Sequence, residues 1–331
     1  MNRLLPYLGL LVITFLSSMP SSSASEDESI KEYAFPLMGT RFLVRGEGLD
    51  EEDVRAAVEL GKKINSACSD YDATSELMKL NHWPENQPFA LSPILKDVLA
   101  EALTISKLTE GAYDPTVGWH TWNWRKSRRD HTLPKLEAIA KAKAATGWNQ
   151  LVLNSEESTI TKLLPNMRID LGGIAKGYTA DRILSLLQQR GIKKASVAAG
   201  GDLCLGEAPS GKEGWAVSLK TLDAENKLVP QHLLLSQRGI STSGDIHQWI
   251  EIEGKRYSHI VDAATGLGLE RRISATVIAD KTTWSDALAT ALCVRPDIME
   301  KLVKEAGIKA WIVLEDENGQ NQLIKSSNAD N

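Results

Sequence analysis

The chain has 331 residues, of which 24% are charged, and its formal net charge at pH 7 is −5. This length allows one large domain or two average ones, each with a sizeable buried core. A net negative charge is the opposite of what a nucleic-acid surface requires, so we expect no nucleic-acid partner.

The first 25 residues have the pattern of a secretory signal peptide. An apolar run over residues 4–16 follows a single positive charge, and small residues come after it. The run is shorter than the roughly 20 residues that a membrane-spanning helix needs. We therefore expect residues 1–25 to be a signal and residues 26–331 to form the functional domain. The protein would be periplasmic or exported, or attached to the inner membrane if the signal is not cleaved. Because no cysteine ends the run, a lipoprotein is not predicted.

After an acidic, Ser-rich linker over residues 20–32, one strand is predicted at 41–46. Apolar residues then recur at helical spacing over 51–68, behind an acidic start that favours a helix N-terminus. Further helices are predicted over 92–111, which opens with Ser-Pro and closes with Gly, and over 134–147. The N-terminal third is therefore predicted to be mainly helical.

From residue 148 onward, short β-rich runs are separated by Gly, Asp, Glu and Lys turns. These runs lie at 150–154, 159–164, 195–199, 215–220, 232–236, 248–252, 256–262, 274–279 and 309–315. Helices are expected only near 175–190, 282–293 and 296–306. Since residues 253–255 alone separate two of the runs, that pair must be antiparallel. We therefore predict an α+β fold with a largely antiparallel sheet and flanking helices.

Residues 169–181, IDLGGIAKGYTAD, place an acid, two adjacent glycines and a lysine before a predicted helix. The spacing fits neither a Walker loop nor a Rossmann fingerprint. The glycines nonetheless permit close approach of a ligand, and Lys176 and the helix N-terminus offer positive charge for phosphate. Taken alone, the stretch is more often a strand-turn-helix joint with a surface lysine. The GGDL turn at 200–203 is a similar but weaker signal.

The predicted helix that begins near Thr282 carries Asp286 and Thr290 four residues apart, on one face. A carboxylate and a hydroxyl are hard oxygen donors that suit Mg²⁺. In the competing interpretation, Asp286 favours the helix N-terminus and Thr290 bonds back to a carbonyl.

His259 lies in the run 256–262, where an extended chain would place it opposite Ser258 and Ile260. A histidine there could accept a proton from an attacking hydroxyl at neutral pH. A structural histidine is the competing interpretation, and His247 is a rival for the role. A turn is predicted at STSGD, residues 241–245.

The three cysteines, Cys68, Cys204 and Cys293, form an odd set whose spacing matches no zinc site. We expect them to be small buried residues, although one disulfide is possible.

Eight segments, taken in order, resemble the ApbE family of flavin transferases. They extend over nearly the whole chain that follows the signal: MGT at 38–40, SDYDATSELMKLN at 69–81, GAYDPTVG at 111–118, DLGGIAKGYTAD at 170–181, GGDL at 200–203, STSGD at 241–245, RYSHIVDAATG at 256–266 and SDALATAL at 285–292. Each segment is a weak signal alone, but the ordered set is specific.

The resemblance implies an ApbE-like T-shaped architecture and the activity of an FAD:protein FMN transferase. Family members hold FAD with Mg²⁺, and a threonine of a partner protein attacks the phosphorus on the riboflavin side. FMN then becomes linked to the partner by a phosphoester, and AMP is released. The partner would be a flavin-accepting, membrane-associated redox subunit. An FAD pyrophosphatase that yields FMN and AMP, or a non-catalytic periplasmic flavin-binding protein, are the alternatives.

The resemblance also implies roles for individual residues. Contacts to the cofactor are expected from Met38, Tyr71, Ala112, Tyr113, Asp114, Asp170, Lys176 and, through its backbone, Ile260. The Gly173 carbonyl, Asp286 and Thr290 would hold the metal, and His259 would be the catalytic residue beside the reacting phosphate. The chain departs from the family at Ala263, where a proline is usual, at Ala289, where some relatives carry a second acid, and over 119–130, which is aromatic and basic.

Overall fold

The structure is a computed structural model that describes residues 30–222, 227–244, 249–316 and 318–330. The predicted signal segment, residues 1–25, and the rival histidine His247 lie outside this range. A search of the described helices finds none that is long and apolar enough to cross a membrane.

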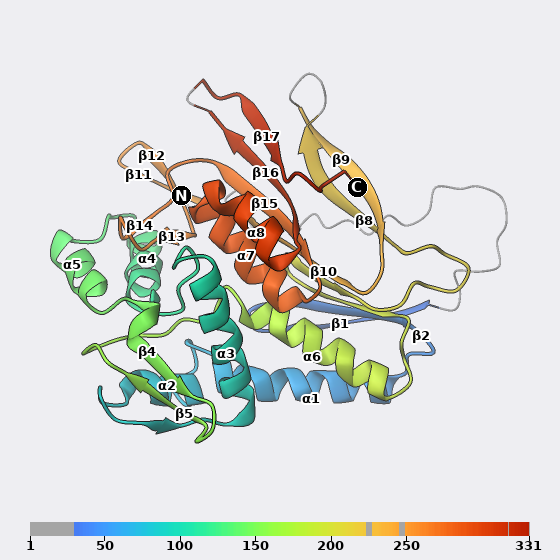
Figure 1. The fold of residues 1–331 in the computed structure, drawn as a ribbon, viewed down its shortest axis with the longest axis horizontal. Helices are drawn as coiled ribbons and strands as arrows, with labels where there is room; N and C mark the ends of the chain where they lie inside the picture. The colour runs from blue at the N-terminus through green and yellow to red at the C-terminus, as the bar shows by residue number, and fades with distance from the viewer. Residues whose placement is uncertain (1–29, 223–226, 245–248, 317, 331) are drawn as a thin grey trace, which may run out of the picture.

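An eight-stranded sheet forms the centre of the molecule, and every neighbouring pair of its strands is antiparallel. In spatial order (Figure 1) the strands are β1 (Ile30–Leu37), β2 (Thr40–Glu47), β6 (Ala195–Ala199), β7 (Asp202–Leu205), β10 (Arg238–Gly244), β15 (Ile273–Ala279), β16 (Lys309–Glu315) and β17 (Asn321–Lys325). The small and β-branched residues of β15 are buried along its whole length, as expected for a strand covered on both faces. The predicted α+β fold with a largely antiparallel sheet is confirmed.

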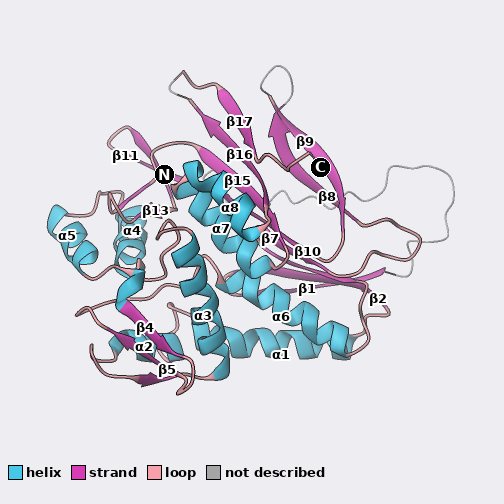
Figure 2. Ribbon diagram, in the orientation of Figure 1, coloured by secondary structure: helices cyan, strands magenta, loops and turns pink. Residues whose placement is uncertain are grey.

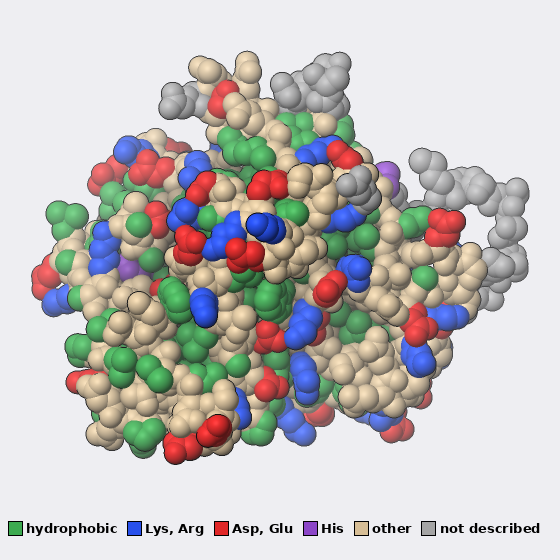
Figure 3. Space-filling view, in the orientation of Figure 1, with side chains coloured by type: hydrophobic (Ala, Val, Ile, Leu, Met, Phe, Trp, Pro, Cys, Tyr) green, Lys and Arg blue, Asp and Glu red, His purple; other side chains and the backbone are tan. Residues whose placement is uncertain are grey.

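Helices cover one face of this sheet and a hairpin covers the other. The covering helices (Figure 2) are α1 (Glu51–Cys68), α6 (Ala175–Gln189), α7 (Thr282–Val294) and α8 (Met299–Ala306). On the opposite face, the hairpin of β8 (Trp215–Leu222) and β9 (Leu228–Leu235) packs its Trp215 into a cluster with Trp311. Figure 3 shows acidic and basic side chains interspersed over the helical face, so neither sign dominates the surface drawn there.

The remaining elements form a second body of helices and short sheets beside the main sheet (Figure 1). Its helices are α2 (Glu76–His82), α3 (Pro93–Leu108), α4 (Gly118–Asp130), α5 (Leu136–Ala144) and the 3₁₀ turn η2 (Trp148–Gln150). Its strands are β3 (Phe89–Ala90), β5 (Thr159–Lys162) and β4 (Leu151–Asn154), followed by the pairs β11 (Trp249–Ile252) with β12 (Lys255–Ser258) and β13 (Val261–Asp262) with β14 (Leu267–Gly268). The predicted antiparallel pair around residues 253–255 is confirmed as β11 and β12.

Several local predictions were wrong. The linker predicted to end at residue 32 gives way to β1 at Ile30, because β1 pairs along its full length with β2. The segment STSGD is not a turn at its start, since Ser241 to Gly244 belong to β10 and pair with β15. The helices α2 and α4 and the strand β17 were not predicted, and the helix predicted over 296–306 is divided into a 3₁₀ turn, η3 (Pro296–Ile298), and α8.

The predicted strand over 256–262 is broken at His259. The Ser258 hydroxyl accepts a hydrogen bond from the Ile260 amide, which bends the chain between β12 and β13. His259 therefore lies in a bend and not on the face of a strand.

Gly177 allows α6 and α7 to pack unusually closely. A Cβ at this position would lie 2.4 Å from the backbone oxygen of Thr282, at the start of α7. Only glycine fits such an approach of one backbone to another. This contact brings the first turn of α6 beside the first turns of α7.

Candidate active site

A cavity of about 660 Å³ lies where the main sheet meets the second body. Its volume is in the range of small-molecule and cofactor sites. Eleven of the twelve predicted site residues line it: Tyr71, Ala112, Tyr113, Asp114, Asp170, Gly173, Lys176, His259, Ile260, Asp286 and Thr290. The chain therefore gathers segments more than 200 residues apart into one wall.

The predicted metal ligands come together at one end of the cavity. A Cβ built on Gly173 would lie 3.6 Å from Thr290 Oγ1, so the bare glycine backbone faces that hydroxyl. Thr290 Oγ1 also lies 3.1 Å from the Ser243 hydroxyl of β10. Asp286, one helical turn earlier, accepts a hydrogen bond of 3.1 Å from the Gly177 amide. A carbonyl, a hydroxyl and a carboxylate, all oxygen donors, are what Mg²⁺ prefers.

Lys176 lies between two buried carboxylates. Its Nζ is 3.1 Å from Asp286 Oδ2 and 3.2 Å from Asp202 Oδ2. Burial, followed by the charge of Asp286, raises the pKa of Asp202 to about 7. Burial alone would lower the pKa of Lys176, but the two carboxylates raise it above its ordinary value, so the ammonium form persists at neutral pH. The described residues contain no group of three His, Cys, Asp or Glu side chains placed for a metal, so hydroxyl and carbonyl oxygens would have to complete any cation site.

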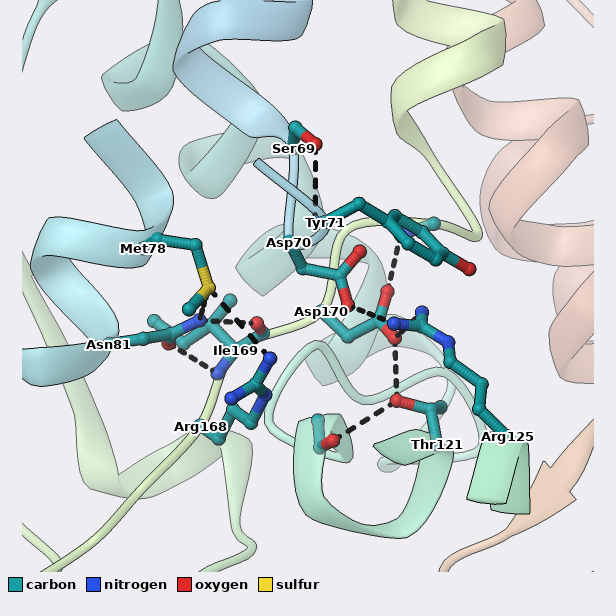
Figure 4. Close-up of polar contacts among 12 residues, drawn as sticks. Ser69, Asp70, Tyr71, Met78, Asn81, Thr121, Arg125, Arg168, Ile169 and Asp170 are labelled. Atoms are coloured by element: carbon teal, nitrogen blue, oxygen red, sulfur yellow. Dashed lines mark hydrogen bonds and ion pairs between the residues drawn. The ribbon is translucent and has the colours of Figure 1, made fainter. Parts of the chain in front are cut away.

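Asp170 shapes the glycine turn that Gly173 belongs to. Its Oδ1 accepts a hydrogen bond of 2.7 Å from the Gly172 amide. Its Oδ2 accepts hydrogen bonds from Thr121 Oγ1, at 2.6 Å, and from Arg125, at 2.8 Å (Figure 4). Both oxygens of this carboxylate therefore have partners inside the chain, while the residue also lines the cavity.

The segment over 112–114 forms another wall. The Asp114 carboxylate accepts hydrogen bonds from the Thr116 amide and hydroxyl and from the Trp148 amide, so it holds the segment in place. Burial raises the pKa of Asp114, against the effect of these hydrogen bonds. Tyr113 is buried, and its hydroxyl has no hydrogen-bond partner among the described residues.

Comparison with a family sequence model shows which family the chain belongs to. The sequence model of the ApbE family matches residues 38–312. The chain belongs to the ApbE family. The predicted family is therefore confirmed.

Relatives of this ApbE chain cover most of its length. An FAD:protein FMN transferase of Klebsiella pneumoniae (strain 342) is 32% identical over 293 residues, which cover 85% of this chain and 83% of the relative. An FAD:protein FMN transferase of Vibrio cholerae serotype O1 is 30% identical over 301 residues, with coverage of 88% and 90%.

Solved ApbE structures share the fold. The flavin transferase ApbE from Vibrio cholerae superposes with a TM-score of 0.82 at 28% identity, covering 91% of this chain and 98% of that one. The ApbE protein of Thermotoga maritima gives a TM-score of 0.76 at 26% identity, covering 90% and 97%.

Two predicted contacts of the ApbE site are placed differently from expectation. Met38 lies in the turn between β1 and β2 and is not among the residues that line the cavity; its sulfur accepts a hydrogen bond of 3.5 Å from Thr179. Ile260 does line the cavity, but its amide donates to Ser258 and its carbonyl accepts from Leu269. The backbone of Ile260 is therefore already engaged within the chain.

Three residues that line the cavity were not predicted as site residues, Thr121, Arg125 and Asp202, and a fourth, Asp70, pairs with Arg125. Two of them lay in quoted motifs, Asp202 as the acid of the GGDL turn and Asp70 in the segment over 69–81. Arg125 lies in the aromatic and basic stretch over 119–130, which departs from the family pattern. No local spacing indicates its partners, because Asp70 is 55 residues away in sequence and Asp170 is 45.

Proposed function

We propose that this chain is an Mg²⁺-dependent FAD:protein FMN transferase that attaches FMN to a threonine of a partner protein. The proposal rests on one observation above the others. The oxygen donors Gly173, Asp286 and Thr290 lie in the same cavity as Lys176 and the exposed ring of Tyr71. A single bound dinucleotide could thus meet an aromatic ring at one end and a cation site at its diphosphate. The relatives from Klebsiella pneumoniae and Vibrio cholerae, both FAD:protein FMN transferases, support the same activity.

The charges of the cluster suit a diphosphate only in company with a cation. The carboxyl groups of Asp202 and Asp286 outnumber the single ammonium group of Lys176, and because the pKa of Asp202 is about 7 this group is only partly ionised at neutral pH, so the cluster alone carries no net positive charge. The Gly173 carbonyl, Asp286 and Thr290 would hold Mg²⁺, which would supply neutralising charge to the diphosphate oxygens. Lys176, already aligned by its two carboxylates, would orient toward phosphate in the same region.

We assign to His259 the role of the base that accepts the proton of the acceptor threonine's hydroxyl. It is half-buried and lines the cavity at the bend between β12 and β13. The acceptor threonine Oγ forms a bond to the phosphorus of the FMN half. The bond from that phosphorus to the bridging oxygen breaks, AMP leaves with that oxygen, and the hydroxyl proton passes to His259.

We further propose that the protein acts after export, on a flavin-accepting redox subunit associated with the membrane. The motivation is the signal-like pattern of residues 1–25, since an exported transferase can reach only acceptors outside the cytoplasm. Mass spectrometry of periplasmic and membrane proteins, with and without this chain, would identify the acceptor as a protein whose threonine gains the mass of FMN. Modified proteins found only in the cytoplasm would contradict this assignment.

The test of the activity uses the mature chain with FAD, Mg²⁺ and an acceptor domain. The expected result is flavin fluorescence that stays with the acceptor after denaturation, together with release of AMP. Asp286→Asn should lower the rate by ~100-fold, because it removes the one charged ligand of the cation that would neutralise the diphosphate. Asp280→Asn is the matched control, since this acid is exposed just before α7 and should leave the rate unchanged.

Other products would contradict the proposal in recognisable ways. Metal-dependent release of AMP without an acceptor, with no labelled protein when the acceptor is added, would indicate an FAD pyrophosphatase. Tight FAD binding without any AMP would indicate a flavin-binding protein that does not catalyse.

A further inference from the structure

Arg125 of α4 joins two buried carboxylates that come from distant parts of the chain. One guanidinium nitrogen, Nη1, pairs with Asp70, and Nη2 lies 2.8 Å from Asp170 Oδ2 (Figure 4). Both carboxylate side chains are almost fully buried, whereas the arginine is about one-quarter exposed. The planar guanidinium holds its nitrogens in a fixed geometry, so each carboxylate pairs with its own nitrogen.

The same guanidinium lies against the ring of Tyr71. Its Cζ is 4.2 Å from the ring centroid, within the range of a cation–π contact. Tyr71 is 79% exposed, and its amide donates a hydrogen bond to the Ser69 hydroxyl. The ring lines the cavity. Arg125 is therefore the side chain that restricts an otherwise exposed aromatic ring at the cavity wall.

We propose that Arg125 is a positioning residue for the planar ring system of the ligand. The guanidinium lies over one face of the Tyr71 ring and holds the ring in place. The flavin would then stack on the opposite face. The same side chain fixes Asp170, whose other oxygen holds the glycine turn at Gly172. This inference rests on the proposed function, because it takes the ligand to be a flavin dinucleotide.

Pre-organisation explains why such a side chain would matter for binding. A free Tyr71 ring would lose rotamer freedom when a ligand stacks on it, and ordering a side chain costs roughly 0.5–1.5 kcal/mol. Because Arg125 already orders the Tyr71 ring in the unliganded protein, this free-energy cost is not added when the ligand binds. The stack that results, guanidinium, phenol ring and flavin, is also favoured by the offset packing of aromatic rings.

A purely structural role for Arg125 makes a different prediction. Burial and the charge of Asp170 already raise the pKa of Asp70, which shows that the two carboxylates disfavour each other. Without the arginine both carboxylates would lose their ion pair, with only the more distant charge of Arg168 to offset them, and the fold would lose stability. If charge compensation were its whole role, neutralising one carboxylate should restore the melting temperature, the FAD affinity and the fluorescence quenching that are lost with the arginine.

The experiment compares Arg125→Gln, Arg125→Lys and the double variant Asp70→Asn with Arg125→Gln in the mature protein. Lys126→Gln is the matched control, because Lys126 is exposed on the same helix and its loss changes the net charge equally. Each variant is titrated with FAD and Mg²⁺ while the quenching of flavin fluorescence and the melting temperature are followed.

We expect Arg125→Gln to weaken FAD binding about tenfold and to reduce the quenching at saturation. Arg125→Lys should fall short of the wild type in both, and the double variant should regain melting temperature but neither affinity nor quenching. Wild-type affinity and quenching in Arg125→Gln, or their full return in the double variant, would overturn the inference.

The two proposals fail separately. If the wild-type chain binds FAD but labels no acceptor, the proposed function fails while the effect of Arg125 on binding stands. If the wild type labels its acceptor but Arg125→Gln binds and quenches FAD as the wild type does, only the role of Arg125 fails. A wild-type chain that binds no FAD would overturn both.

Discussion

The hydroxyl of Tyr113 is buried in the cavity wall without a hydrogen-bond partner among the described residues. Burial and three nearby carboxylates raise the pKa of Tyr113, so it remains a neutral donor at physiological pH. An unpaired buried hydroxyl costs about 1–3 kcal/mol. Functional sites often reduce the stability of the unliganded protein in this way, because their polar groups gain partners only when the ligand binds.

We therefore expect Tyr113→Phe to stabilise the unliganded protein by about 1 kcal/mol and to weaken FAD binding by roughly fivefold. Melting temperatures with and without FAD, and a binding titration, measure both effects. Tyr178→Phe is the control, since its hydroxyl already pairs with Asp97 and its loss should not stabilise. Tyr113→Phe with unchanged stability and affinity would show that the hydroxyl has no role.

A second residue, His120 of α4, gives the fold a pH dependence. It is fully buried, and neither ring nitrogen has a hydrogen-bond partner among the described residues. Burial, aided by Lys143 and opposed by Asp262, lowers its pKa from 6.5 to about 4. Because the pKa of His120 is lower in the folded protein than in the unfolded chain, the unfolded chain binds more protons between pH 6.5 and 4. The free energy of unfolding therefore falls as the pH falls from 6.5 towards 4.

At 1.36 kcal/mol per pH unit, the wild type should lose about 3 kcal/mol more over this interval than His120→Phe, which cannot titrate there. Urea unfolding at pH 7, 5.5 and 4 measures the difference, and the carboxylates shared by both proteins cancel in it. Parallel pH curves for the two proteins would contradict the assignment.

At the scale of elements, the helix that carries the predicted metal ligands is capped by another helix. The residue before α7, Lys281, makes no side-chain cap. Asp181 of α6 replaces it and accepts hydrogen bonds from the Thr282 amide at 2.9 Å and the Thr283 amide at 2.8 Å. A carboxylate at this end also suits the helix dipole.

Asp181→Ala should therefore destabilise the protein by about 1–2 kcal/mol, seen as a melting temperature several degrees lower. The matched substitution Asp280→Ala, at an exposed acid beside the same helix, should change it little. Equal effects of the two substitutions would mean that the cap contributes nothing.

The elements also show what local sequence can and cannot predict. The helix α7 was predicted over 282–293, and the structure places it at Thr282–Val294. The helix α4 was missed because it buries only Gly118, His120, Trp124 and Ser127, a set with no regular apolar period. Arg125, which α4 presents to the cavity, was missed with it.

At the scale of the whole molecule, the ordered motifs contain most of the residues that line the cavity. The ion pairs between carboxylates and basic side chains far apart in sequence could not be predicted from them. Lys176 was expected near phosphate, but its approach to Asp286 depends on the close packing of α6 and α7 at Gly177, and its approach to Asp202 depends on the packing of α6 on β7. The bend at His259 likewise depends on a hydrogen bond and not on strand alternation. Such contacts arise only when the complete chain folds.

The fold holds together without a disulfide, since all three cysteines are buried and none is bonded to another. Burial raises the pKa of Cys68 to about 12, and that of Cys204 also lies well above its ordinary value, so neither thiol is reactive when the protein is folded. We expect a thiol reagent to label no cysteine in the native protein and all three in urea, and dithiothreitol to leave the melting temperature unchanged. Refolding without a reductant should give a lower yield, because an odd set of exposed thiols can pair wrongly in the unfolded chain. A melting temperature that falls on reduction would reveal a native disulfide and contradict this view of the fold.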